Sequence, residues 1–268
     1  MNFILNNRTA LITGGSKGIG KAIAEAFAAE GASVIITARS DAELSLAAQD
    51  IKKNAHGEVA SYALDAIKSE NVETMALDVK KKFGKLDILV NNVGGVERFG
   101  GFFDLTDHDW LNAYDLNFLS AVYFCRAFVP LLALSDCGRM VNISSLAAHQ
   151  PGFFNPHYAA AKAALLNLNK YMSNTLAGDN ILVNAICPST VKGGGWGRNI
   201  ADRAARGSIS VEEAECLMEE EENKKSPLGR MVSLEDIAMM VLFLASPLNN
   251  SITGSVIDVD GGKRKGIS

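Results

Sequence analysis

The sequence lacks several features that would assign it to other protein classes. No uninterrupted apolar stretch approaches the roughly 20 residues that a membrane-spanning helix needs, so we expect no membrane anchor. No basic run with interleaved aromatic residues is present, and the formal net charge of -4 gives no general attraction to nucleic acid. A strand pattern begins almost at the first residue and leaves no room for a signal peptide, which favours a cytoplasmic protein.

Cysteine is scarce, and its placement argues against disulfides and metal sites. The four cysteines are scattered, without a C-x-x-C pair and without a histidine at metal-binding spacing: Cys125, Cys137, Cys187 and Cys216. We therefore expect reduced thiols and no metal ion. Hydrophobic residues make up 48% of the chain and charged residues 21%, which is ordinary for a soluble globular protein. Nothing demands a second domain, so residues 1–268 are expected to form one.

Short β-branched runs alternate with longer amphipathic stretches along the chain. The runs that predict strands are 9–13, 34–37, 61–64, 86–90, 139–143, 181–185 and 254–258. The stretches that predict helices are 21–30, 41–54, 69–83, 107–134 and 155–177. Near-continuous apolar strands separated by helices require a parallel sheet with both faces covered. The sequence therefore predicts an α/β fold, a Rossmann-type doubly wound parallel sheet of about seven strands with helices on both faces.

One segment, 192–226, interrupts this alternation. It carries the three consecutive glycines 193–195 and then a charged helical pattern over 211–225. The acidic run 219–222 is expected to be a solvated helix face. An insertion that opens with flexible glycines, between a strand and the closing helix, is where a substrate lid would lie. We therefore expect residues 192–226 to cover part of a binding site.

A glycine-rich loop, TGGSKGIG at 13–20, ends the first expected strand, and a helix follows at once. Gly14 permits a turn with positive φ, Gly18 lets backbone approach a pyrophosphate, and Gly20 allows close helix packing. The amino terminus of the helix offers free N–H groups and a partial positive charge. A tight strand-to-helix turn alone also uses glycines, but this position at the head of an α/β chain favours a dinucleotide site.

Five segments resemble, in their order, the signature motifs of the short-chain dehydrogenase/reductase family. They are TGGSKGIG at 13–20, NNVG at 91–94, Asn117, NISS at 142–145 and YAAAK at 158–162. The resemblance runs from about residue 8 to residue 262. It implies a nicotinamide dinucleotide cofactor, a small carbonyl or alcohol substrate and a homo-oligomer, which we expect to be a tetramer. In the glycine loop it implies cofactor contacts from Gly14, Ser16, Lys17, Gly18, Ile19 and Gly20.

The residues after the second expected strand predict the choice of cofactor. Enzymes that use NAD usually place an acid there to bind the ribose 2′-hydroxyl, but this chain has Ala38, Arg39 and Ser40. Arg39 offers a planar fork of donors that suits a phosphate, and Lys17 adds a second positive charge on the same side. By resemblance this basic pair marks members that prefer NADPH, so we expect NADP(H) rather than NAD(H); the alternative is two ordinary surface cations. The resemblance implies further cofactor contacts at the 2′-phosphate side, the adenine amino group, the adenosine ribose and the nicotinamide: Ser40, Asp65, Asn91, Gly94, Pro188 and Val191.

The segment after the sixth expected strand departs from the family pattern. Where the family typically has Pro-Gly and then a threonine, this chain has Pro188 followed by Ser189, and Gly193 at the threonine position. Thr190 is the candidate to replace the missing hydroxyl.

The reaction that the resemblance implies needs a proton donor at the carbonyl oxygen, because hydride addition leaves negative charge there. Tyr158 and Lys162 are four residues apart on an expected helix and so share one face. A nearby ammonium stabilises a phenolate, so we expect Lys162 to lower the pKa of Tyr158. By resemblance, Lys162 also binds the nicotinamide ribose, Ser145 hydrogen-bonds the substrate oxygen, and Asn117 holds a water for proton relay. We call these four residues the catalytic tetrad.

The sequence therefore predicts an oxidoreductase that transfers a hydride between NADP(H) and a ketone, aldehyde or secondary alcohol, with Tyr158 as the acid/base. Two alternatives stay open. A 3-oxoacyl-thioester reductase would need a basic patch at the pocket mouth, and a catalytically inactive NADPH-binding sensor or scaffold need not keep the tetrad. The three-residue gap between Tyr158 and Lys162 disfavours an enoyl reductase. The sequence does not identify the substrate. Five side chains flank the expected site and suggest a partly aromatic pocket, but we expect each to serve packing rather than substrate recognition: His149, Phe153, Phe154, His157 and Trp196.

Overall fold

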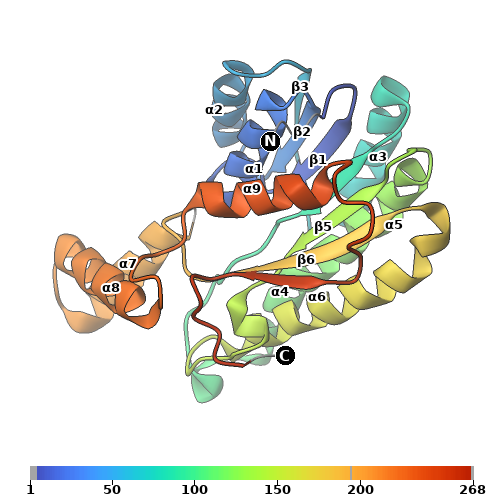
Figure 1. Cartoon of the computed structure of the whole chain (residues 1–268). Helices are drawn as coiled ribbons and strands as arrows, with labels where there is room; N and C mark the ends of the chain where they lie inside the picture. The colour runs from blue at the N-terminus through green and yellow to red at the C-terminus, as the bar shows by residue number, and fades with distance from the viewer. Residues whose placement is uncertain (1–4, 194, 267–268) are drawn as a thin grey trace.

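The structure is a computed structural model that describes residues 5–193 and 195–266. Its described residues form one parallel sheet of seven strands (Figure 1). The strand order is β3-β2-β1-β4-β5-β6-β7. The order reverses between β1 and β4, and sheets of this kind bind ligands outside the carboxyl ends of the strands at such a point. The strands are β1 (Thr9–Thr13), β2 (Ser33–Ala38), β3 (Val59–Ala63), β4 (Ile88–Asn91), β5 (Arg139–Ile143), β6 (Leu182–Pro188) and β7 (Val256–Val259).

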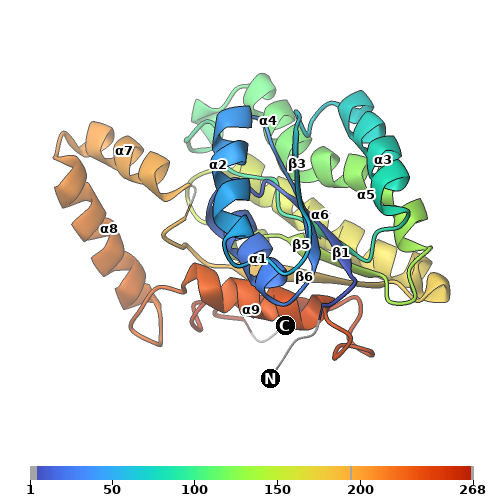
Figure 2. The ribbon, with the colours of Figure 1, turned by 90° about the horizontal axis from the view of Figure 1, so that it is seen from above.

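Helices cover both faces of the sheet, and each layer has its own hydrophobic core (Figure 2). On β1, Ile12 belongs to the core under one layer, while its neighbour Leu11 belongs to the core under the other. Residues that point to either face of the strand are therefore buried and apolar, which explains the uninterrupted apolar run in the sequence. The doubly wound α/β fold is confirmed. One layer contains α1 (Gly18–Ala29), α2 (Asp41–Lys52) and α9 (Leu234–Ala245), and the other contains α3 (Ser69–Phe83), α4 (Asp107–Tyr114), α5 (Ser120–Leu132) and α6 (Pro156–Thr175).

The long helix expected over 107–134 forms from Asp107 to Leu132, but it is not α-helical throughout. A π-helical turn, Asp115–Leu119, joins α4 to α5, and the fully buried Asn117 lies at its centre. Such turns insert one extra residue into a helix and often occur at functional sites. The apolar pattern does not reveal the turn, because the helix continues in nearly the same direction on both sides.

The same helical stretch, Asp107–Leu132, is long and apolar enough to cross a membrane by length and composition alone. Its most apolar window has a mean hydropathy of 1.3, and 44% of that window is buried inside the fold. In the structure α5 packs against α3 and β4, and α4 packs against α6. The helical layer over the sheet therefore explains the buried apolar side chains of this stretch.

The insertion forms a helical hairpin that extends away from the sheet and its two layers (Figures 1 and 2). Its helices are α7 (Trp196–Gly207) and α8 (Val211–Lys225). We call residues 196–225 the lid hairpin. Its helices pack on each other through a small core of their own, formed by Trp196, Ile200, Ala204 and Ala214.

Candidate active site

A large cavity opens at the carboxyl ends of the central strands, where the strand order reverses. Among the described residues it measures about 1560 Å³, whereas a site for one drug-sized ligand typically has roughly 300–1,000 Å³. It therefore has room for a dinucleotide and a second molecule. The residues expected from the sequence line this cavity, with three exceptions: Gly20, Asn91 and Asn117.

The glycine loop between β1 and α1 forms one end of the cavity. Gly14 and Gly18 have φ values of +67° and +58°, in the region that favours glycine. A side chain at Gly20 would place its Cβ 2.3 Å from the carbonyl oxygen of Gly14, so Gly20 permits close packing behind the loop. Because α1 begins at Gly18, its free N–H groups lie at the loop. These features fit the pyrophosphate of a dinucleotide.

Arg39 and Lys17 both line the cavity, and each is paired with a glutamate. Lys17 Nζ lies 3.2 Å from the Glu43 carboxylate, and Arg39 Nη1 lies 3.5 Å from Glu97 Oε1. The Lys17 and Arg39 side chains are 60% and 67% exposed, so both ion pairs are weak. Ser40 also lines the cavity and caps α2 by accepting a hydrogen bond from the backbone of Glu43. Glu43 and Glu97 would therefore compete with a bound phosphate for the two cations. The sequence did not predict these ion pairs.

The ends of β3 and β4 form the wall next to the glycine loop. Asp65, just past β3, lines the cavity as expected from its position. Asn91 does not line the cavity, because its side chain is buried and donates a hydrogen bond to Asn142 Oδ1 at 2.9 Å. Its neighbour Asn92 does line the cavity, and its amide donates to the carbonyl oxygen of Thr13 at 2.8 Å. Asn92 thus ties β4 to the glycine loop, a role for which the NNVG motif was the available signal.

Ser145, Tyr158 and Lys162 meet on the cavity wall between β5 and α6. Ser145 follows β5 and opens a short 3-10 turn, η3 (Leu146–Ala148). Tyr158 and Lys162 lie on α6, and Lys162 Nζ is 6.0 Å from the centre of the Tyr158 ring. Lys162 is 2% exposed and donates a hydrogen bond from Nζ to the carbonyl oxygen of Ile143 at 2.9 Å. The fold therefore brings together three members of the tetrad.

Burial controls the ionisation of the two titratable members of the tetrad. Burial raises the pKa of the Tyr158 phenol above its usual value of 10.0, and a hydrogen bond with Ser145 offsets part of this effect. Burial lowers the pKa of the Lys162 ammonium to about 8. The expectation that Lys162 lowers the pKa of Tyr158 is wrong in this structure, because the apolar surroundings disfavour both charged forms. Tyr158 is therefore held protonated, as a proton donor must be.

Ser144, the neighbouring serine, has a different role from Ser145. Its Oγ donates a hydrogen bond to the backbone carbonyl of Lys162 at 3.0 Å. This contact fastens α6 to the end of β5. Ser145 is the serine that hydrogen-bonds with Tyr158.

Asn117 lies behind the cavity wall, against the loop that follows β4. Its Oδ1 accepts from the backbone N–H of Gly95 at 2.8 Å, and its Nδ2 donates to the carbonyl oxygen of Gly95 at 3.0 Å. A Cβ atom at Gly94 would lie 2.7 Å from both Asn117 Oδ1 and Lys162 Nζ. The loop after β4 therefore packs closely against Asn117 and Lys162, and a side chain at position 94 would clash with both.

The segment after β6 passes along the opposite wall. Pro188, Thr190 and Val191 all line the cavity. A Cβ atom at Gly193 would lie 3.2 Å from Leu234 Cδ2 and 3.6 Å from the Cα atom of Gly18. The contact with Gly18 would be an ordinary one and the tighter contact is with the end of a leucine side chain, so packing alone does not explain the departure from the family pattern.

Aromatic side chains line another part of the cavity. Phe153, Phe154 and Trp196 line it, as their place in the sequence suggested, and Phe153 is 98% exposed. His149 and His157 do not line it. His157 is buried, and its ring packs edge-on against Trp110.

Lysines from the lid hairpin and the carboxyl-terminal segment also line this part of the cavity, and two glutamates pair with three of them. Glu222 accepts hydrogen bonds from Lys225 and from Lys263, both at 2.8 Å. Lys224 is paired with Glu220 at 2.6 Å. Two carboxylates thus face four lysines, Lys265 included, so only part of the basic patch that a 3-oxoacyl-thioester reductase would need is cancelled.

The sequence and the fold are similar to those of known oxidoreductases. Residues 14–264 match a family model described as enoyl-(acyl carrier protein) reductase. The 3-oxoacyl-[acyl-carrier-protein] reductase FabG of Chlamydia muridarum is 33% identical over 265 residues, which are 98% of this chain and 99% of that protein. L-sorbose reductase from Gluconobacter frateurii, solved with NADPH and L-sorbose, superposes with a TM-score of 0.93 at 31% identity over 100% of both chains. A variant of actinorhodin polyketide ketoreductase, solved with NADPH, has a TM-score of 0.88 at 27% identity and covers 96% of this chain and 97% of its own.

These similarities extend over almost the whole chain, and they agree with the geometry of the cavity. The glycine loop, Ser145, Tyr158 and Lys162 lie where a dinucleotide and a carbonyl group could meet. The chain is an NAD(P)H-dependent oxidoreductase of carbonyl and alcohol groups. It belongs to the short-chain dehydrogenase/reductase family.

Proposed function

We propose that the chain reduces small polar ketones with NADPH and that Tyr158 donates the proton. One observation carries this proposal: a single cavity joins the glycine loop, the basic side chain of Arg39 and the pair Ser145 and Tyr158. A cofactor that lies along this cavity has its phosphates at one end and its reactive ring near the phenol.

The protein's part in the reaction is to bind the carbonyl oxygen and to protonate it. NADPH, when bound, supplies the hydride. The oxygen then carries negative charge, and the hydroxyl groups of Ser145 and Tyr158 are placed to donate hydrogen bonds to it. Because burial keeps the phenol protonated, Tyr158 has a proton to give. Lys162, with a pKa of about 8, is mostly charged at neutral pH, and we assign its ammonium to the nicotinamide ribose, as the resemblance implies.

Charge at the cofactor end supports NADPH over NADH. Arg39 and Lys17 line the cavity where β2 ends, and Ala38 leaves no carboxylate at the position that NAD enzymes use for the ribose hydroxyls. A 2′-phosphate carries more negative charge than either paired glutamate and can replace both. The similar L-sorbose reductase and polyketide ketoreductase structures both contain NADPH.

Polar groups at the substrate end support a small polar ketone. Glu222, Lys263 and Gln150 line the cavity and offer both donors and acceptors for substrate hydroxyl groups. The similarity to L-sorbose reductase, at 31% identity over the full chain, favours a polyhydroxy ketone. The similarity to a 3-oxoacyl reductase, at 33% identity, favours an acyl thioester. We rank the polyhydroxy ketone first because the L-sorbose reductase matches this chain over its full length and because side chains such as Gln150 and Glu222 offer partners for hydroxyl groups.

Consumption of NADPH with a panel of carbonyl compounds tests the proposal. The panel contains L-sorbose, an acetoacetyl thioester and a simple ketone without hydroxyl groups, each with the wild type and with Tyr158→Phe. Faster turnover of the hydroxylated ketone, lost in the variant, supports the proposal. Faster turnover of the thioester would replace it with the acyl reductase. NADPH binding without turnover of any member would instead indicate the inactive sensor.

We also propose a homo-oligomer, most simply a tetramer. Within the described residues β7 pairs only with β6, so one edge of the sheet is open to another chain. Leu111 on α4 and Tyr171 on α6 are 64% and 63% exposed, and such apolar faces can pair across a twofold axis. A monomer at micromolar concentration in light scattering would rule this out. The cytoplasmic location stays a prediction from the sequence, which cell fractionation can test.

A further inference from the structure

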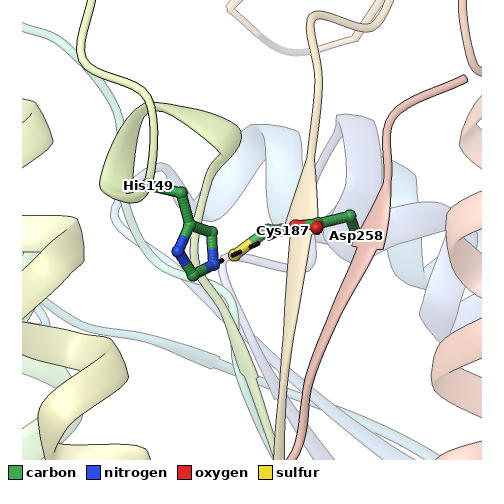
Figure 3. A group of neighbouring side chains, drawn as sticks. All are labelled: His149, Cys187 and Asp258. Atoms are coloured by element: carbon green, nitrogen blue, oxygen red, sulfur yellow. Dashed lines mark ion pairs between the residues drawn. The ribbon is translucent and has the colours of Figure 1, made fainter. Parts of the chain in front are cut away.

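Three side chains from separate parts of the sequence converge beside the active site (Figure 3). His149 follows η3, Cys187 lies on β6, and Asp258 lies on β7. The ligand-forming atoms of the three, an imidazole nitrogen, a sulfur and a carboxylate oxygen, all lie within 4.8 Å of one another. Cys187 and Asp258 are register partners in the parallel pair β6–β7, so the sheet itself fixes two of the three groups.

Two atoms of this group are buried and have no hydrogen-bond partner among the described residues. They are His149 Nε2 and Asp258 Oδ1. They lie 4.0 Å apart, which is too far for a direct hydrogen bond. The other carboxylate oxygen of Asp258 accepts from Arg264 Nη1 at 2.8 Å, which orients the carboxylate. A buried polar atom without a partner destabilises the fold, so a bound group that contacts both atoms would be favoured.

We propose that His149, Cys187 and Asp258 bind a zinc ion. Nitrogen, sulfur and oxygen are the ligand atoms that Zn²⁺ uses, whereas Mg²⁺ and Ca²⁺ prefer oxygen alone. In a tetrahedral site with bonds of about 2.0–2.3 Å, ligand atoms lie about 3.3–3.8 Å apart. The three atoms here need to approach by about 1 Å or less to reach that arrangement. A water molecule completes the fourth position.

The charges of the site balance. Zinc binding converts the Cys187 thiol to a thiolate and releases its proton to solvent. The thiolate and the Asp258 carboxylate together neutralise the two positive charges of the ion. Arg264, bound to the other oxygen of Asp258, is the outer partner that holds this ligand in place.

The ion would position the active site without taking part in the chemistry. None of its three ligands lines the cavity, but their neighbours do: Ser145 opens the turn that ends at His149, and Pro188 follows Cys187. Zinc would therefore fasten the segment that carries Ser145 to the last two strands of the sheet. The site is independent of the choice of substrate and cofactor.

Cobalt(II) in place of zinc gives a direct test with the full-length protein. The chain is stripped with a chelator and titrated with CoCl2. One equivalent should produce a thiolate-to-cobalt absorption band, which ZnCl2 then removes. Cys187→Ser should abolish the band. Cys216→Ser, at the exposed cysteine of the lid hairpin, is the matched control and should keep it.

His149→Ala provides a second variant in a segment outside the buried core. We expect it to weaken cobalt binding by more than about a hundredfold, because loss of even an outer partner of a metal ligand typically costs 10–100-fold. Absence of a band in the wild-type chain would overturn the proposal. So would a band that His149→Ala leaves unchanged, and this outcome can be read even if Cys187→Ser does not fold. Neither readout depends on turnover, so failure of the proposed reductase activity would not affect the result.

Discussion

Replacing Arg39 and Lys17 together by alanine should remove the preference for NADPH. Both side chains line the cavity at the end of β2, where Ala38 offers no acceptor for a ribose hydroxyl. A 2′-phosphate is the one group that distinguishes the two cofactors, so only NADPH loses contacts in the double variant. The Michaelis constant for NADH should barely change.

The size of the effect follows from the exposure and pairing of the two cations. Charge-assisted hydrogen bonds typically contribute about 1.5–3 kcal/mol each. Arg39 and Lys17 are 67% and 60% exposed, and each must leave its glutamate before it binds a phosphate. We therefore take the lower end, about 1.4 kcal/mol or a factor of ten per cation. The double variant should raise the NADPH constant by about a hundredfold at low salt, and less in concentrated salt.

A change of opposite sign tests the same reasoning. Glu97→Gln removes the carboxylate that competes for Arg39, so it should lower the NADPH constant by a few-fold and leave the NADH constant unchanged. Lys53→Ala is the matched control for the Arg39 and Lys17 double variant, because Lys53 is an exposed cation that is paired with Asp50 and does not line the cavity. Steady-state kinetics give the Michaelis constants for NADPH and for NADH of the wild type and of each variant.

Two results would refute the reasoning. A wild-type enzyme that already prefers NADH would mean that the basic pair is an ordinary solvated surface. An equal effect of Lys53→Ala and of the double variant would mean that only the net charge of the protein matters.

Three further predictions concern the tetrad. Tyr158→Phe should lower kcat by at least about a hundredfold while NADPH affinity, measured by fluorescence, stays within a few-fold, because the ring still packs but has no proton to give. Gly94→Ala should lower kcat by up to about a hundredfold and lower the melting temperature as well, since its Cβ would lie 2.7 Å from Lys162 Nζ and from Asn117 Oδ1, and both side chains are buried. Burial lowers the pKa of Lys162 from 10.5 to about 8, so between these values the unfolded chain binds one more proton than the folded one. The free energy of unfolding should therefore rise with pH across this window by about 3 kcal/mol, and denaturant titrations of Lys162→Met should lack the rise.

The sheet and the cofactor end could be predicted because their signals are local. A glycine loop directly after a strand specifies its own geometry, and the apolar runs of β1 and β5 follow from burial on both faces. Tyr158 and Lys162 are close because one helix carries both. Each of these relations spans only a few residues.

The features that the sequence did not reveal depend on contacts between distant segments. The pairs of Arg39 with Glu97 and of Lys17 with Glu43 form only when loops from different strands meet at the cavity. The π turn at Asn117 depends on its fit to the loop after β4. The raised pKa of Tyr158 depends on the summed burial of its surroundings, which no spacing encodes.

The grouping of His149, Cys187 and Asp258 is the clearest example of a feature that depends on contacts between distant segments. Metal-binding spacings in a sequence detect ligands that lie on one loop or helix. Here the ligands come from a turn and two strands that become neighbours only when the sheet forms. Searching for cysteine and histidine at the carboxyl ends of adjacent expected strands would have found two of them.

The separate core of the lid hairpin has a consequence for how new specificities can arise in this enzyme. Trp196, Ile200 and Ala214 form a cluster separate from the two cores of the sheet, and polar contacts such as that of Arg198 with the carbonyl oxygen of Val96 join the hairpin to the main fold. Tyr158 and Lys162 lie on α6, and the glycine loop joins β1 to α1, so none of them belongs to the hairpin. We therefore expect that exchange of residues 196–225 between relatives would change the substrate while the glycine loop and α6 stay as they are.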